Sequence, residues 1–199
     1  MIARRTLLGA AALLSASSAR AWAVADTDVE LVTGLGVVKL RLSAAAPLTT
    51  ANFLRYVDSG RLAGATFYRA ARAPGTTDVG LIEGGLQNDP AKLYPPVRHE
   101  STTMTRLAHI DGTISMARDG PGTATADFFI CCGPAPYLDA HPEAPGDNLG
   151  YAAFGQVTEG MDLLRTILGS PTGAPARNPV MQGQMLDAPV KITRAGRVP

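Results

Sequence analysis

The chain has 199 residues, enough for one domain with a sizeable core, and its formal net charge of +1 argues against a basic surface for nucleic acid. With 46% hydrophobic and 18% charged residues, the composition also excludes disorder over most of the chain. The 21 glycines and 15 prolines indicate many turns between short elements.

Residues 1–23 are typical of a secretory signal peptide. Arg4-Arg5 precedes an Ala/Leu-rich run, and Ala21-Trp22-Ala23 matches a cleavage signal. The apolar run is too short for a stable membrane span. The paired arginines resemble a twin-arginine export signal, and an ordinary Sec signal with two chance arginines is the alternative. Both routes predict a periplasmic protein that has no membrane attachment after cleavage, with residues 24–199 as its single domain.

Hydrophobic periodicity in the rest of the chain predicts short strands with two helices among them. Leu40 and Leu42 alternate with Lys39 and Arg41, as in a strand with one buried face. Such patterns between turn formers predict strands over 29–33, 37–42, 66–70, 79–83, 113–117, 128–132, 151–157 and 190–195. Apolar residues three or four apart, ended by a glycine, predict helices over 47–59 and 159–168. About eight strands suit a closed β-barrel, because closure removes exposed sheet edges.

Two adjacent cysteines, Cys131 and Cys132, lie in one predicted strand. Neighbouring strand residues point to opposite faces, so a disulfide between them would need unusual geometry. We therefore interpret them as small apolar strand residues rather than a redox or metal site. No metal is expected, because the histidines show no ligand spacing. No Ser/His/Asp arrangement for nucleophilic catalysis is evident either.

Three motifs together resemble the cyclophilin family of peptidyl-prolyl cis-trans isomerases. They are Thr66-Phe67-Tyr68-Arg69, Gly80-Leu81-Ile82-Glu83-Gly84-Gly85 and the stretch from Gly112 to Cys132. The resemblance runs from about Val29 to Ala195. It implies a mainly β fold, a closed eight-stranded antiparallel barrel capped by two α-helices. It also implies an enzyme without a cofactor, whose partners are proline-containing polypeptides, and we expect a monomer.

Prolyl isomerisation sets modest chemical requirements. Rotation about a peptide C–N bond has a barrier of about 18–20 kcal/mol, which a catalyst lowers by stabilising the twisted amide. A fixed guanidinium can do this beside an apolar wall that holds the proline ring. Phe67-Tyr68-Arg69 resembles the family's Phe-His-Arg, which makes Arg69 the candidate catalytic residue. The resemblance implies further substrate-binding residues at Phe67, Leu81, Glu83, Met116, Ala117, Arg118, Asp127, Phe129, Tyr137, Leu138 and Tyr151.

Three positions depart from the family pattern. Glu83 and Asp127 stand where the family has glutamines that flank the arginine, and Gly80 stands where it usually has phenylalanine. We expect two carboxylates beside Arg69 and a looser proline pocket. These changes support an alternative function, a peptide-binding or chaperone module with weak or no isomerase activity. A barrel that holds a small apolar ligand is a third, weaker interpretation.

Overall fold

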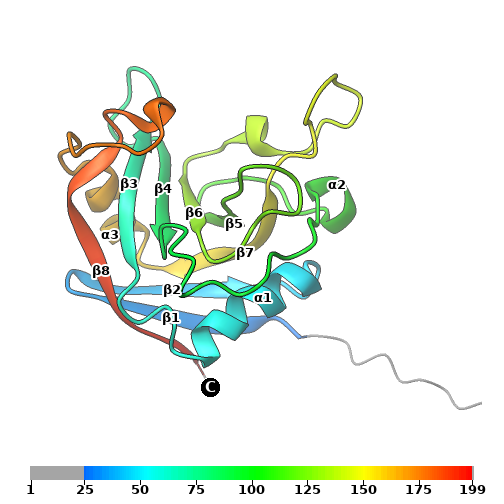
Figure 1. The fold of residues 1–199 in the computed structure, drawn as a ribbon, viewed down its shortest axis with the longest axis horizontal. Helices are drawn as coiled ribbons and strands as arrows, with labels where there is room; N and C mark the ends of the chain where they lie inside the picture. Colours follow the sequence, from blue (N-terminus) through cyan, green and yellow to red (C-terminus); the bar gives the residue numbers. More distant parts are fainter. Residues whose placement is uncertain (1–24, 199) are drawn as a thin grey trace, which may run out of the picture.

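The computed structural model describes residues 25–198, whose strands form a closed antiparallel barrel (Figure 1). The predicted signal peptide, 1–23, lies outside the described residues. The strands are β1 Thr27–Thr33, β2 Gly36–Leu42, β3 Thr66–Arg72, β4 Gly80–Gly85, β5 Thr113–Met116, β6 Phe128–Cys132, β7 Ala152–Glu159 and β8 Met185–Arg197. The helices are α1 Pro47–Asp58, α2 Thr102–Thr105 and α3 Met161–Leu168, with short 3-10 helices at Pro136–Leu138 and Pro179–Met181.

Strand order around the barrel is β1-β2-β7-β5-β6-β4-β3-β8, and β8 closes the ring by pairing with both β1 and β3. The predicted fold class is therefore confirmed. All predicted strands are present, and β8 is longer than expected because its pairing with β1 continues to Arg197, opposite Val29. The sequence analysis missed α2 and both 3-10 helices, since each is one short turn inside a Pro/Gly-rich or irregular segment.

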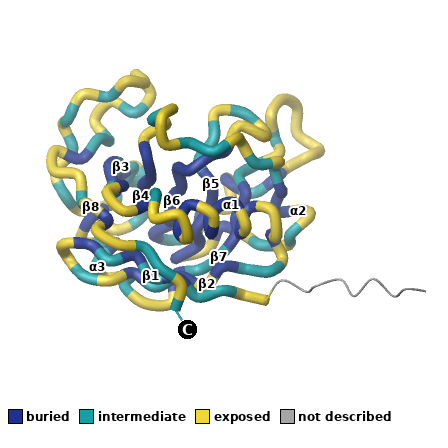
Figure 2. Tube along the Cα trace, turned by 60° about the horizontal axis from the view of Figure 1, so that its bottom comes forward, coloured by how far each residue is buried: buried dark blue, intermediate teal, exposed yellow. Residues whose placement is uncertain are grey.

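The interior of the barrel is a packed hydrophobic core. Alternate residues of each strand point inward, as the fully buried Leu40 and Leu42 do in β2. Phe53 of α1 packs edge-to-face on Phe128 of β6, with ring centroids 5.4 Å apart. Figure 2 shows the buried residues gathered at the centre, inside exposed loops. A filled interior argues against the interpretation that the barrel holds a small ligand.

Two main helices cover the barrel. α1 packs against β7 and β8, and α3 packs against β2, β3, β4 and β6. α1 begins at Pro47, and the buried Glu100 carboxylate satisfies the next backbone donors, accepting from the Thr49 N–H at 2.7 Å. Within residues 25–198, no helix combines the length and apolarity needed to cross a membrane.

Candidate active site

A β-bulge in β3 brings Tyr68 and Arg69 to the same side of the barrel wall. Phe67 pairs with Gly84 and Arg69 pairs with Glu83, so the register shifts at Tyr68. Such a bulge re-aims side chains that would otherwise alternate. As a result, Phe67 points into the core, whereas Tyr68 and Arg69 both reach the Glu83 side chain on the outer face.

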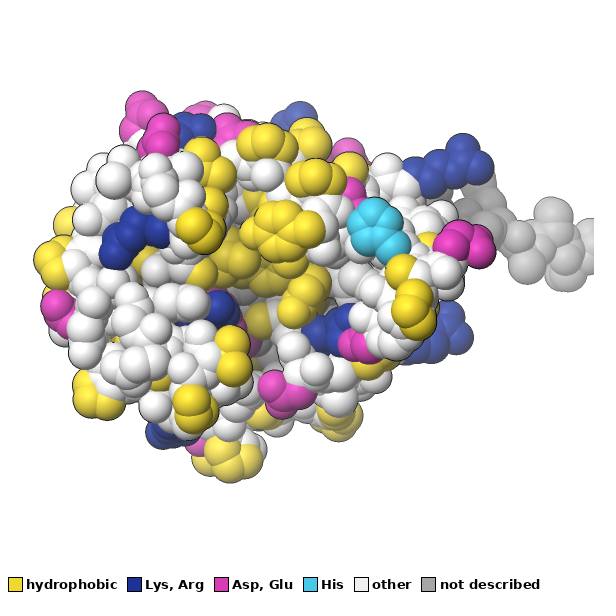
Figure 3. Space-filling view, turned by 90° about the horizontal axis from the view of Figure 1, so that it is seen from above, with side chains coloured by type: hydrophobic (Ala, Val, Ile, Leu, Met, Phe, Trp, Pro, Cys, Tyr) yellow, Lys and Arg dark blue, Asp and Glu magenta, His cyan; other side chains and the backbone are white. Residues whose placement is uncertain are grey.

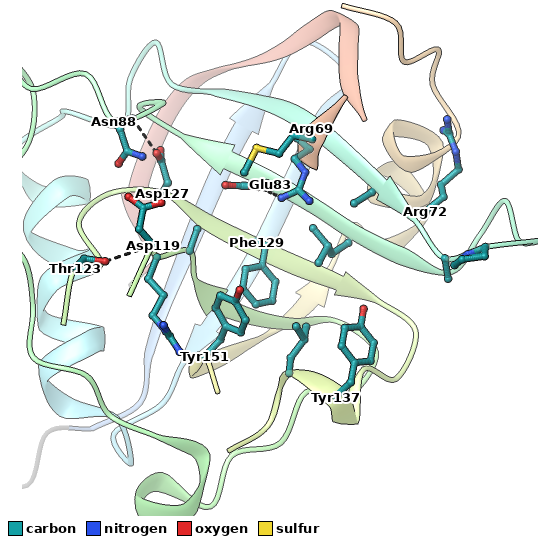
Figure 4. A pocket seen from close by; sticks show the side chains of 18 residues that line it. Arg69, Arg72, Glu83, Asn88, Asp119, Thr123, Asp127, Phe129, Tyr137 and Tyr151 are labelled. Atoms are coloured by element: carbon teal, nitrogen blue, oxygen red, sulfur yellow. Dashed lines mark hydrogen bonds and ion pairs between the residues drawn. The ribbon is translucent and has the colours of Figure 1, made fainter. Parts of the chain in front are cut away.

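The Arg69 guanidinium is held by two partners. Its Nη1 donates to Glu83 Oε2 at 2.5 Å (Figure 4). Its Nε donates to Gln184 Oε1 at 2.8 Å. The side chains of Arg69 and Glu83 are 17% and 9% exposed, so water screens this ion pair only weakly. Tyr68 donates its hydroxyl to Glu83 Oε1 at 2.8 Å. Burial, together with the adjacent Glu83 charge, raises the pKa of Tyr68 and keeps it a donor.

An apolar wall lies beside this guanidinium, on the outer face of β4, β6 and β5. Its buried centre is Phe129, Cys131, Ala135 and Leu138, with Leu81, Ala117 and Tyr151 packed against it. The Tyr151 ring meets Phe129 edge-to-face at 5.3 Å. Tyr137 is 69% exposed and lies at the rim. Figure 3 shows hydrophobic side chains inside and around a hollow on this face.

Wall and guanidinium share one cavity of about 470 Å³. Of the predicted site residues, it brings together Arg69, Leu81, Glu83, Ala117, Arg118, Asp127, Phe129, Tyr137, Leu138 and Tyr151. The cavity does not include Phe67 or Met116. Both are buried in the barrel core. Met116 lies two residues after Ile114 in β5, so both side chains point inward. Their prediction as substrate-binding residues is not supported by this placement.

Asp127 does not flank Arg69 as expected. Its two carboxylate oxygens accept from the backbone N–H groups of Gln87 and Asn88, each at 2.9 Å. Gln87 and Asn88 both have a φ of 53°, so the carboxylate stabilises a left-handed turn after β4. Burial raises the pKa of Asp127 to about 6, and these N–H groups oppose the shift. One carboxylate, not two, therefore pairs with the guanidinium.

Gly80 lies where two backbone segments approach closely. It begins β4 with a φ of 157°, and a Cβ there would lie 2.3 Å from the Ala71 carbonyl oxygen. The close approach of two backbones fixes glycine at this position. Gly80 adds no side chain to the cavity lining, and the looser proline pocket stays a prediction.

A buried Ser–His–Asp chain lies directly behind the wall, which the sequence analysis missed. His109 Nδ1 is 2.6 Å from Asp139 Oδ1, and its Nε2 is 2.9 Å from Ser115 Oγ. Burial lowers the pKa of His109, although Asp139 opposes the shift, so the neutral ring donates to Asp139 and accepts from Ser115. The ring stacks on Phe129 at 5.8 Å. With Ser115 and His109 fully buried, this chain supports the wall and is not open to a substrate.

Arg118 lines the cavity but uses its donors within the protein. It binds Asp147 at 2.7 and 3.1 Å, and it donates to the Gly150 carbonyl at 2.7 and 3.0 Å. Arg118 therefore holds the 147–150 loop beside Tyr151. Among residues 25–198, no group of three His, Cys, Asp or Glu side chains could hold a metal ion. Cys131 and Cys132 are both free thiols, and they lie on opposite faces of β6 as the strand pattern predicts.

Comparison with known proteins agrees with this architecture. The family described as "Cyclophilin type peptidyl-prolyl cis-trans isomerase/CLD" matches residues 28–197. The chain is 37% identical over 152 residues to peptidyl-prolyl cis-trans isomerase cyp18 of Streptomyces antibioticus, covering 74% of this chain and 87% of that protein. It is 36% identical to peptidyl-prolyl cis-trans isomerase A of Dickeya dadantii, covering 75% of each chain.

Solved structures show the same fold. A cyclophilin-type isomerase of Cryptosporidium parvum superposes with a TM-score of 0.62 at 20% identity, covering 87% of this chain and 98% of that one. A second crystal structure of that protein, obtained in the presence of the dipeptide Ala-Pro, gives a TM-score of 0.61 over 86% of this chain and 99% of that one. From the matched family and these relatives, the chain belongs to the cyclophilin-type peptidyl-prolyl cis-trans isomerase family.

Proposed function

We propose that this cyclophilin-type isomerase accelerates X-Pro isomerisation in exported proteins, with Arg69 stabilising the twisted amide. The observation that carries the proposal is a fixed, largely buried guanidinium at the edge of an apolar wall. The proline ring packs on Phe129 and Leu138, and the Arg69 donors face the prolyl nitrogen as it regains its lone pair. The Ala-Pro dipeptide named for the C. parvum protein is a suitable first ligand.

Removal of the guanidinium tests this role. Arg69→Ala should lower kcat/KM by about 100- to 1,000-fold, the effect of deleting one transition-state donor. Arg69→Lys should recover little, because an ammonium lacks the planar fork of donors. Both are measured as isomerisation of one Ala-Pro peptide, with circular dichroism to establish folding. Wild-type kcat/KM in a folded Arg69→Ala protein would remove Arg69 from the mechanism.

A second candidate function is peptide binding with little catalysis. It is favoured by one observation, the ion pair in which Glu83 already neutralises the charge of Arg69. NMR exchange between the cis and trans forms of an Ala-Pro peptide separates the two functions. Faster exchange with protein supports the isomerase. Line broadening from binding, with unchanged exchange, supports the binding module.

The export part of the proposal depends on Arg4-Arg5 and Ala21-Trp22-Ala23. Export should give a mature N-terminus near Val24 and protein in the periplasmic fraction. Replacement of both arginines by lysine tests the route, since a twin-arginine signal should lose export. Recovery of the full-length chain from the cytosol would contradict periplasmic localisation.

A further inference from the structure

The segment before β8 contributes a residue to the environment of Arg69. The β8 partners of β3 jump from Val190, opposite Phe67, to Met185, opposite Arg69. This irregularity places Gln184 beside Arg69, although 115 positions separate them in the sequence. The sequence analysis assigned no function to residues 170–184. This segment nevertheless supplies the Nε partner of the candidate catalytic guanidinium.

The backbone of Gln184 is fixed on both sides. Its N–H donates to the Met181 carbonyl at 3.0 Å, which closes the turn after the 3-10 helix Pro179–Met181. Its carbonyl accepts from the Ala70 N–H at 2.9 Å, next to Arg69 in β3. Gly183, with a φ of 78°, allows the chain to turn between these two bonds. The side chain therefore reaches Arg69 from an anchored backbone.

Two contacts on different nitrogens define the orientation of a guanidinium. The group is planar and carries five N–H donors. Gln184 holds Nε and Glu83 holds Nη1, so rotation of the plane would break at least one bond. Within residues 25–198, Nη2 has no hydrogen-bond acceptor, and Arg69 lines the cavity. Three donors are therefore left for a substrate, both N–H groups of Nη2 and the second N–H of Nη1.

The two partners differ in charge. Glu83 is a carboxylate and binds through a short charge-assisted bond, which partly neutralises the positive charge of Arg69. Gln184 offers a neutral amide oxygen, which fixes direction without neutralising charge. We propose that Gln184 is a positioning residue for Arg69, which holds Nε so that the Nη2 donors face the bound prolyl peptide. This inference rests on the proposed role of Arg69.

The central experiment compares two glutamines of the same turn. Gln184→Ala should lower kcat by about 10- to 100-fold with KM near the wild-type value, because a misplaced catalytic group costs rate more than binding. Gln182→Ala is the matched control. Gln182 is exposed, and its side chain makes no hydrogen bond among the described residues, so this variant should keep wild-type kinetics. Equal kcat values in the two variants would overturn the inference.

A double-mutant cycle separates this inference from the proposed function. In an Arg69→Ala background, Gln184→Ala should cause no further loss, because the group that it positions is gone. A large Arg69 effect with none from Gln184 would reject the positioning role and leave the proposed function intact. Wild-type activity in Arg69→Ala would reject the proposed function itself, and the positioning role with it. A further loss in the double mutant would also overturn the inference, since Gln184 would then act without Arg69.

A measurement independent of activity guards against misfolding. Gln184→Met keeps the length of the side chain and removes the acceptor, so the fold should persist. In ¹H–¹⁵N spectra, the Arg69 Nε–H signal, assigned by its loss in Arg69→Lys, should shift in Gln184→Met and stay unchanged in Gln182→Ala. An unshifted signal in a folded Gln184→Met protein would show that Gln184 does not hold Nε.

Discussion

Replacement of Glu83 by glutamine should make the enzyme faster. In the structure, Oε2 of the Glu83 carboxylate accepts from Arg69, and Oε1 accepts from the Tyr68 hydroxyl. A glutamine can keep both contacts: its Oε1 accepts from Arg69, and its amide N–H donates to the Tyr68 oxygen, because a hydroxyl both donates and accepts. The Glu83→Gln variant therefore changes the charge beside Arg69 and leaves the arrangement of side chains in place.

The size of the effect follows from the change of acceptor. A charge-assisted bond is roughly twice as strong as a neutral one, and bonds to charged groups contribute about 1.5–3 kcal/mol. Exchange of carboxylate for amide should weaken the hold on Arg69 by about 1 kcal/mol, since the pair is largely shielded from water. If the Glu83 pair competes with the prolyl nitrogen for the guanidinium, kcat/KM rises about fivefold.

The assay is NMR exchange on one Ala-Pro peptide, with both proteins measured at the same pH and salt concentration. Glu159→Gln is a matched control, because Glu159 also pairs with a cation, Lys39, but at an exposed site away from the cavity. It should leave kcat/KM unchanged. A Glu83→Gln variant no faster than wild type would refute the competition and indicate that the carboxylate orients Arg69 usefully.

Two further predictions concern stability. Asp127 has a pKa of about 6 in the fold against 3.8 for a free side chain, so the folded state binds more protons between these values. The free energy of unfolding should then fall by about 2 kcal/mol as pH rises from 4 to 6, and Asp127→Asn should remove that slope in urea titrations. Parallel curves for the two proteins would contradict the raised pKa. Gly150→Ala should lower the melting temperature more than Gly146→Ala: both glycines have positive φ, but a Cβ at Gly150 would lie 2.6 Å from the Ala140 nitrogen, whereas at Gly146 it meets only a side chain at 3.9 Å. Equal falls in melting temperature would show that the positive φ alone, and not the clash with Ala140, sets the loss of stability.

The sequence predicted the barrel because its strands are locally consistent. Alternation in β2, the short apolar run of β6, the helix before Gly60 and the turn-forming residues between the strands all favour one fold. The same alternation could have placed Met116 correctly, since Ser115 and Ala117 occupy the opposite face of β5. The predicted substrate-binding segment begins at Met116, whereas the cavity lining begins one residue later, at Ala117.

Other parts of the site depend on irregularities that a sequence pattern does not reveal. The bulge at Tyr68 breaks the period of two in β3, so alternation gives the wrong face for Phe67 relative to Arg69. Asp127 accepts from backbone N–H groups of the left-handed turn at Gln87, which lies far from Asp127 in the sequence. His109, in the loop before β5, meets Asp139 only after that loop packs on the segment that follows β6, and a histidine in a loop carries no signal for that contact.

Closure of the barrel has a consequence for how the chain is made. β1 is synthesised first and β8 last, yet Val29 and Arg197 are paired across the seam. A nascent chain therefore cannot complete the ring until its final strand has left the ribosome, and until then β1 and β3 each present an unpaired edge. Contacts between residues so far apart in the sequence also form slowly. The protein is consequently exposed to aggregation and to holding chaperones for the whole time of its synthesis.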